Sequence, residues 1–206
     1  MADEDLPQTY LITPPAIELS SFPDQLARVL DGSDVACLRL ALSSRDEDLV
    51  LKTADMLREV SHARDVAIVI TEHLGLVERL GLDGVHLEDG AHKVRYARKE
   101  LGGDAIVGAF SGTSKHDAMT AAEAGSDYVS LGPVGASALG DGSIVEHDLF
   151  SWWSETIETP IVAEGHLTED LVRQFAPVTD FFGIGEEIWN AEDPLATLLA
   201  LQSAMS

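Results

Sequence analysis

The stretch that decides the fold opens with Asp83-Gly84-Val85-His86-Leu87-Glu88-Asp89-Gly90, continues with Ala105-Ile106-Val107-Gly108-Ala109 and closes with Tyr128-Val129-Ser130-Leu131-Gly132-Pro133-Val134. It contains three short apolar runs that each end in small or polar residues, and a helix-like segment separates each run from the next. This rhythm is typical of consecutive βα units. Because the carboxyl ends of parallel strands meet on one face, where ligands bind, the stretch predicts both a fold and the position of a site.

Five further apolar runs extend the pattern to both ends of the chain. The eight runs are 10–12, 35–42, 66–70, 84–87, 106–109, 128–131, 161–163 and 181–184. Several are rich in Val and Ile and do not alternate, as expected of strands that are buried on both faces. Eight strands alternating with about eight helices predict an α/β fold, a compact (β/α)8 TIM barrel. A doubly wound open sheet is the alternative, although no Gly-x-Gly-x-x-Gly turn follows the first run.

Helix signals lie between the apolar runs. Residues 46–61 place their apolar side chains on one face at helical spacing. Ser114-Lys115-His116-Asp117 is a capping box that opens a helix, and Gly125 ends it. Asp193-Pro194 supplies an N-cap and a first-turn proline for the last helix. Further helices are expected over 93–101, 149–157 and 171–175.

The composition restricts the classes of partner. Hydrophobic residues make up 45% of the 206 residues, so we predict one folded domain over 1–206 with a short acidic tail at 1–8. The 36 acidic and 13 basic residues give a formal charge of −23, a surface that repels nucleic acid and anionic membranes. No run is long and apolar enough to span a bilayer, and no signal-peptide pattern opens the chain. The expectation is a soluble, cytoplasmic protein that binds a small molecule and could form a homo-oligomer.

Several of these segments resemble the thiamine phosphate synthase family, which includes the thiazole tautomerases. The family has a Gly-Val-His-Leu strand, an Ile-(Ile/Val)-Gly strand with a Ser-x-x-Thr turn, and an Ala-Gly-Ala-Asp-Tyr strand that leads to Gly-Pro-(Val/Ile). The matching segments here are 84–87, 106–108 with 111–114, and 124–134. Tyr10-Leu11-Ile12-Thr13 and Pro160-Ile161-Val162-Ala163 look like the first and seventh strands of the family. The resemblance spans roughly residues 9 to 200 and implies a (β/α)8 barrel that acts in thiamine biosynthesis.

The resemblance implies a transferase with a ligand at the C-terminal face of the barrel. The family couples a hydroxymethylpyrimidine diphosphate to a thiazole phosphate and releases pyrophosphate, with Mg²⁺ held by carboxylates. The resemblance assigns catalytic contacts to the diphosphate or pyrophosphate to Arg39, Ser111 and Thr113, and the second hydroxyl of the family aligns with Ser114, next to Thr113. The carboxylates for Mg²⁺ would be Glu72 and Asp89, with Glu88 as the alternative to Asp89. The substrate-binding positions would be Gly132, Gly165, His166 and Gly185.

The sequence departs from the family where the family binds phosphate. Ala41 and the loop Ser137-Ala138-Leu139-Gly140 stand where the family has lysines. His166 replaces the second glycine of a Gly-Gly pair, and Gly185-Glu186-Glu187 replaces a Val-Ser-like phosphate grip. Two carboxylates at that point repel a phosphate dianion, by roughly 4 kcal/mol for unit charges about 4 Å apart at an effective dielectric near 20. Thr113 stands where the tautomerases have a histidine, so a tautomerase would lack its general base.

Three functions are therefore open. The chain is a thiamine phosphate synthase with an altered phosphate site, a divergent paralogue that acts on a less anionic small molecule, or a non-catalytic binding or regulatory barrel. The mouth of the barrel would also collect acidic residues, with His86 and His166 nearby, as a metal or cation site or as simple solvated charges. The acids concerned are Glu72, Glu88, Asp89, Glu164, Glu186 and Glu187. We expect His86 itself to be a packed, hydrogen-bonded core histidine.

Overall fold

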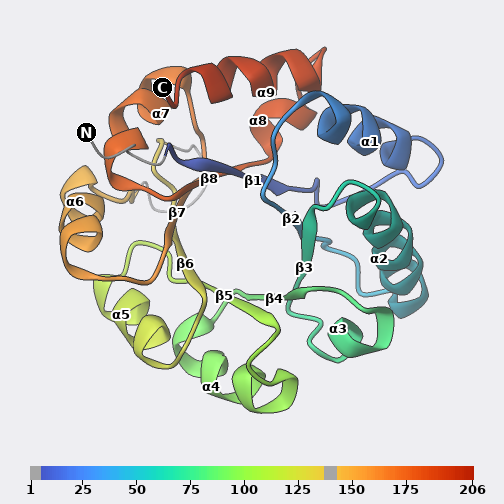
Figure 1. Ribbon diagram of the computed structural model, residues 1–206, viewed down its shortest axis with the longest axis horizontal. Helices are drawn as coiled ribbons and strands as arrows, with labels where there is room; N and C mark the ends of the chain where they lie inside the picture. Colours follow the sequence, from blue (N-terminus) through green and yellow to red (C-terminus); the bar gives the residue numbers. More distant parts are fainter. Residues whose placement is uncertain (1–5, 137–142) are drawn as a thin grey trace.

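A closed barrel of eight parallel strands forms the centre of the computed structural model, which describes residues 6–136 and 143–206 (Figure 1). Each strand pairs with the next in the sequence, and β8 closes the barrel on β1. The predicted (β/α)8 barrel is confirmed, and the open doubly wound sheet is wrong. The strands are β1 (Gln8–Ile12), β2 (Cys37–Leu40), β3 (Ala67–Thr71), β4 (Gly84–Leu87), β5 (Ile106–Phe110), β6 (Tyr128–Leu131), β7 (Ile161–Glu164) and β8 (Phe181–Ile184).

The helices form a ring around the barrel (Figure 1). They are α1 (Phe22–Gly32), α2 (Glu47–His62), α3 (Gly75–Leu80), α4 (Gly90–Leu101), α5 (Lys115–Glu123), α6 (His147–Thr156), α7 (Glu169–Phe175), α8 (Glu186–Trp189) and α9 (Pro194–Ser203). A short 3-10 turn, Ala176–Val178, follows α7. Within the described ranges, no helix has the length and apolar character needed to cross a membrane. The loop expected at 137–140 and most of the acidic tail expected at 1–8 lie outside the described residues.

The three predicted helix starts are confirmed by their capping contacts. The side chain of Asp46 accepts hydrogen bonds from the backbone N–H groups of Asp48 and Leu49, ahead of α2. The Ser114 and Asp193 side chains cap α5 and α9 in the same way. Helices α1, α3 and α8 are additional to those whose residue ranges were expected from the sequence. Of these, α8 matters most for the site because it carries Glu186 and Glu187.

Alternation along the strands separates an outer core from the inside of the barrel. One side of each strand packs against the helices and is apolar, with buried side chains such as Leu11, Leu38 and Ile68. The other side points into the barrel, where a small apolar cluster is built from Tyr10, Val69, Tyr128 and Val162. Interior glycines make room for large neighbours, because a Cβ on Gly108 would collide with the Tyr128 ring. The barrel interior is therefore filled with side chains in interlocking layers, as is usual for this fold.

Three aspartates tie the strands together at the opposite, N-terminal face. Asp83, Asp127 and Asp180 each lie just before an even-numbered strand. Their carboxylates accept hydrogen bonds of 2.7–2.8 Å from backbone N–H groups of the preceding strands β3, β5 and β7. The repeated aspartate therefore fixes each pair of neighbouring strands where the ladder begins.

Candidate functional site

A cavity of about 340 Å³ opens at the carboxyl ends of the strands. Five of the residues predicted for the site line it, namely Arg39, Gly132, Gly165, His166 and Gly185. Its remaining lining residues are Ile12, Phe110, Pro133, Glu164, Gly183, Glu186 and Glu187. The other four predicted residues, Glu72, Asp89, Ser111 and Thr113, do not line it. We call this cavity the mouth pocket.

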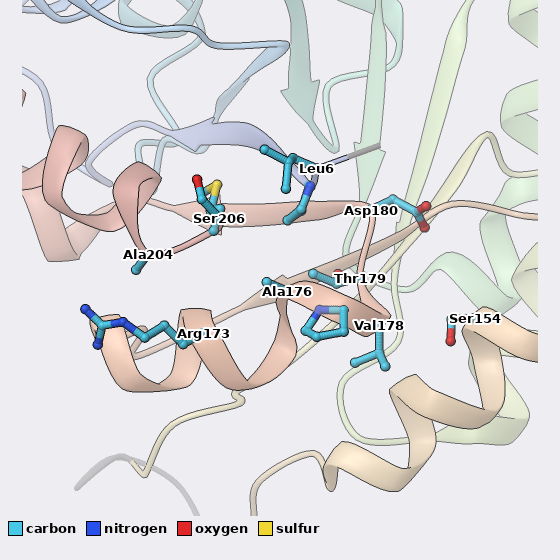
Figure 2. Close-up of a pocket in the computed structure, with 12 residues that line it drawn as sticks. Leu6, Ser154, Arg173, Ala176, Val178, Thr179, Asp180, Ala204 and Ser206 are labelled. Atoms are coloured by element: carbon cyan, nitrogen blue, oxygen red, sulfur yellow. The ribbon is translucent and has the colours of Figure 1, made fainter. Parts of the chain in front are cut away.

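A larger cavity of about 470 Å³ lies near the start of β8, beside the chain's C-terminal residue (Figure 2). Figure 2 shows Leu6 and Ser206 across this cavity from Val178. It borders Asp180, which precedes β8, and therefore lies at the N-terminal face of the barrel. Ligands of parallel barrels bind at the other face, so the mouth pocket is the candidate functional site.

A chain of hydrogen bonds runs through the barrel interior below the mouth pocket. Arg39 Nη1 lies 2.8 Å from Nε2 of His86, and Nδ1 of His86 lies 2.9 Å from the Tyr128 hydroxyl. The Tyr128 hydroxyl in turn contacts the hydroxyl of Tyr10. Because a guanidinium can only donate, Nε2 of His86 must accept, and Nδ1 carries the proton that it donates to Tyr128. The network therefore fixes one neutral tautomer of His86.

Burial keeps His86 and the two tyrosines of this network in their neutral forms. Burial and, next, the charge of Arg39 hold the pKa of His86 well below its usual value. Burial likewise raises the pKa of both Tyr10 and Tyr128. The prediction that His86 is a packed, hydrogen-bonded core residue is confirmed, because the side chain is buried and bonded at both nitrogens.

Arg39 is paired with a carboxylate that the sequence alone did not assign to it. Its Nη1 lies 3.0 Å from Oε2 of Glu164, and the two side chains are only 12% and 11% exposed. Neither Nε of Arg39 nor Oε2 of Glu164 has a partner in hydrogen-bond geometry. We read the contact as a close ion pair between two side chains that line the mouth pocket, and each side chain keeps one buried polar atom without a hydrogen-bond partner among the described residues.

The β7 and β8 ends form the second polar part of the mouth pocket. Glu187 accepts two backbone hydrogen bonds, one at Oε1 from the Leu167 N–H (3.0 Å) and one at Oε2 from the Gly185 N–H (2.8 Å). His166 adopts a left-handed conformation with φ of 55°, and its Nδ1 lies 3.2 Å from Oε1 of Glu186. The Gly-His sequence thus keeps a turn that glycine adopts easily, at a cost of about 1–2 kcal/mol for the histidine.

Gly165 makes that turn fit against the neighbouring strand end. Its φ is 91°, and a Cβ at this position would lie 2.9 Å from Cα of Pro133. The peptide between Gly132 and Pro133 is cis. These glycines therefore line the mouth pocket with backbone, as a glycine is needed wherever two main chains approach closely.

The acidic residues fall into two groups rather than one cluster. Glu164, Glu186 and Glu187 line the mouth pocket, whereas Glu72, Glu88 and Asp89 follow β3 and β4 across the barrel. Glu72 accepts from the Glu88 N–H (2.8 Å) and contacts Nζ of Lys93 (2.6 Å). Asp89 contacts Nδ1 of His92 at 2.8 Å. Over residues 6–136 and 143–206, no three His, Cys, Asp or Glu side chains converge as a metal site.

The two hydroxyls predicted to hold pyrophosphate lie in different surroundings after β5. Ser111 is buried, and its hydroxyl has no hydrogen-bond partner. Thr113 is exposed. Ser114 next to it caps α5, as its position before the helix predicts. Of these residues, Ser111 has the hydroxyl without a hydrogen-bond partner in the described part of the chain, and this hydroxyl is buried outside the lining of the mouth pocket.

Comparison with known proteins gives a consistent result. A family model described as thiamine monophosphate synthase matches residues 9–179. The chain is 37% identical to the thiamine-phosphate synthase of Rhodospirillum centenum over 185 residues, which covers 88% of each chain. It is 30% identical to the thiamine-phosphate synthase of Haloarcula marismortui, covering 100% of this chain and 98% of the relative. The solved structure of thiamine phosphate pyrophosphorylase from Pyrococcus furiosus has the same fold, with a TM-score of 0.83, 19% identity and coverage of 96% and 95%.

Proposed function

The chain belongs to the thiamine monophosphate synthase family, and on that premise we propose that it couples hydroxymethylpyrimidine diphosphate to a thiazole acceptor. In the family, the acceptor carries a phosphate. The bond from the pyrimidine methylene carbon to the diphosphate oxygen breaks, both electrons leave with pyrophosphate, and the thiazole nitrogen forms the new bond to carbon. The observation that carries the proposal is the family match over residues 9–179, which includes the strand ends around the mouth pocket from β1 to β7.

Arg39 is the residue that we assign to the leaving diphosphate. Among the residues that the structure describes, it is the one arginine or lysine that lines the mouth pocket, and its Nε–H has no hydrogen-bond partner. The buried His86 accepts from the guanidinium and orients it. A fixed positive charge in a site of low dielectric stabilises the charge that develops on a leaving group. Ser111, with its free hydroxyl, and Thr113 would add hydrogen bonds to the pyrophosphate.

The side chains after β3 and β4 include carboxylates, the type of ligand that Mg²⁺ takes when it binds together with a diphosphate. Mg²⁺ is usually held by one or two carboxylates, with substrate phosphates and waters completing the shell. Glu72 and Asp89 are the residues that would hold it, and each is paired with a basic side chain, Lys93 or His92, that the cation would replace. The ion would supply charge neutralisation for the diphosphate. We expect the reaction to take place in the cytoplasm.

A direct assay tests this proposal. Purified protein would receive hydroxymethylpyrimidine diphosphate, a thiazole acceptor and Mg²⁺, and the product would be detected as its thiochrome derivative. Formation of product that requires both substrates supports the proposal. If no product forms at high enzyme concentration with either the thiazole alcohol or the thiazole phosphate as the acceptor, the transferase function is refuted.

A non-catalytic binding or regulatory barrel is the second candidate. It is favoured by the ion pair between Arg39 and Glu164, which leaves the guanidinium less positive charge to offer a diphosphate. A screen for metabolites that raise the melting temperature would identify the ligand of such a protein. Stabilisation by a compound unrelated to pyrimidines or thiazoles, together with a negative coupling assay, would favour this candidate.

A further inference from the structure

We propose that Glu187 excludes the phosphate of the acceptor, so that this protein prefers the thiazole alcohol to the thiazole phosphate. The inference rests on the proposed coupling function and specifies the acceptor. Its product would be thiamine rather than thiamine phosphate. The bonds that form and break are those of the coupling reaction, because the hydroxyl or phosphate end of the acceptor takes no part in them.

The position of Glu187 is the first argument. Barrels of this type bind phosphate with the loops after strands 7 and 8 and the N-terminus of a short extra helix. Here the loop after β7 supplies the Leu167 N–H, the loop after β8 supplies the Gly185 N–H, and α8 is the short helix. Both amides donate to the Glu187 carboxylate, one to each oxygen. The donors that would bind a phosphate are therefore already used by a negatively charged group of the protein.

The carboxylate is held in place by the packing of α8. Ile188 is fully buried, and the indole N–H of Trp189 donates to the backbone carbonyl of Ile12 at 2.7 Å. The Trp189 ring also packs edge-on against Phe22, with 5.0 Å between the ring centroids. Because the helix is anchored next to Glu187, the backbone holds this carboxylate at the two amides. A phosphate that bound these amides would have to break both contacts to Glu187.

The remaining charges of the mouth pocket give the second argument. Glu164, Glu186 and Glu187 line it together with two basic side chains, Arg39 and His166. Arg39 is paired with Glu164, and His166 is within 3.2 Å of Glu186. A phosphate dianion would thus meet a carboxylate beside each basic group. A hydroxyl is favoured at the same place, because carboxylates accept hydrogen bonds from O–H donors.

The acceptor preference of the unaltered protein is the primary test. Coupling would be measured with hydroxyethylthiazole and with its phosphate, at equal Mg²⁺ and pyrimidine diphosphate, and the products separated by chromatography. We expect kcat/KM to be at least tenfold higher with the alcohol. A value that is equal or higher with the phosphate overturns the inference and leaves the coupling function standing.

A pair of variants separates the amide contacts from charge alone. Glu187→Ser frees the two amides and removes one charge, whereas Glu186→Ser removes one charge from the same pocket and leaves both amides bound. We expect Glu187→Ser to shift the preference toward the phosphate at least tenfold more than Glu186→Ser does. Equal shifts would overturn the role given to Glu187.

Binding supplies a readout that does not depend on turnover. The unaltered protein would be titrated with each acceptor in a calorimeter, in the presence of pyrophosphate and Mg²⁺. Tighter binding of hydroxyethylthiazole than of its phosphate supports the inference, and tighter binding of the phosphate overturns it. If neither acceptor gives product, the coupling function fails, while this titration still decides whether the pocket discriminates against phosphate.

Discussion

Replacing Glu164 by glutamine should destabilise the protein markedly, because it leaves Arg39 buried without a counter-charge. The charged atoms lie 3.0 Å apart, which at an effective dielectric near 20 corresponds to an attraction of about 5–6 kcal/mol. The glutamine amide oxygen can still accept from the guanidinium, and both side chains keep slight contact with solvent. We therefore expect a net loss near the lower end of the usual range for breaking a buried pair, about 3 kcal/mol.

Urea unfolding at pH 7, followed by circular dichroism, measures this loss. With a urea dependence of about 2–3 kcal/mol per molar, as expected for a chain of this size, the midpoint should fall by about 1 M. The control is the double variant Arg39→Met/Glu164→Leu, which removes both charges and should recover much of the stability. The reasoning is refuted if Glu164→Gln stays within 1 kcal/mol of the unaltered protein, or if the double variant is the less stable of the two.

Three further outcomes follow from the interior and the N-terminal face. Because burial lowers the pKa of His86, the unfolded chain binds one more proton than the folded protein below about pH 6.5. As the pH falls below that value, the free energy of unfolding should therefore decrease by up to about 1.4 kcal/mol per pH unit. In denaturant titrations at pH values from 7.5 to 5, the His86→Gln variant should lack this contribution to the pH dependence of the free energy of unfolding. A variant with the same pH dependence as the unaltered protein would contradict the assignment to His86. Gly108→Ala drives a methyl group into the Tyr128 ring and should cost about 1–3 kcal/mol in calorimetric unfolding; a neutral effect would argue against the interior packing. Asp127→Ala should cost about 1–2 kcal/mol and speed hydrogen exchange at the Val107 amide, and unchanged exchange would count against the strand-tying role.

Local signals were sufficient for most of the secondary structure. The runs at 84–87, 128–131 and 181–184 coincide with β4, β6 and β8, because a strand buried on both faces shows up as an uninterrupted apolar run. The helix caps at Ser114 and Asp193 were equally legible, since a cap depends on residues only a few positions away. Helix α8 has just four residues, which is too short for its apolar side chains to show helical periodicity.

The site was predictable in part. Motif positions led to Arg39, Gly165 and His166, which do line the mouth pocket. The roles of these residues stay predictions. Neither the Glu164 partner of Arg39 nor the Leu167 amide bound by Glu187 follows from motif spacing, because each of these contacts joins the ends of different strands.

The sequence by itself determined the order of strands and helices, the family and the face on which ligands bind, because these follow from local periodicity and from the residues at strand ends. Only the tertiary structure decided which interior groups meet. Tyr10 and Tyr128 are 118 residues apart, and they touch because β8 closes on β1 and turns alternate side chains of every strand toward one axis. The same closure sets Glu164 against Arg39, and the pairing of β7 with β8 brings the Leu167 amide to the carboxylate of Glu187. Packing across the closed barrel, rather than spacing along the chain, thus sets how the charges of the mouth pocket are paired.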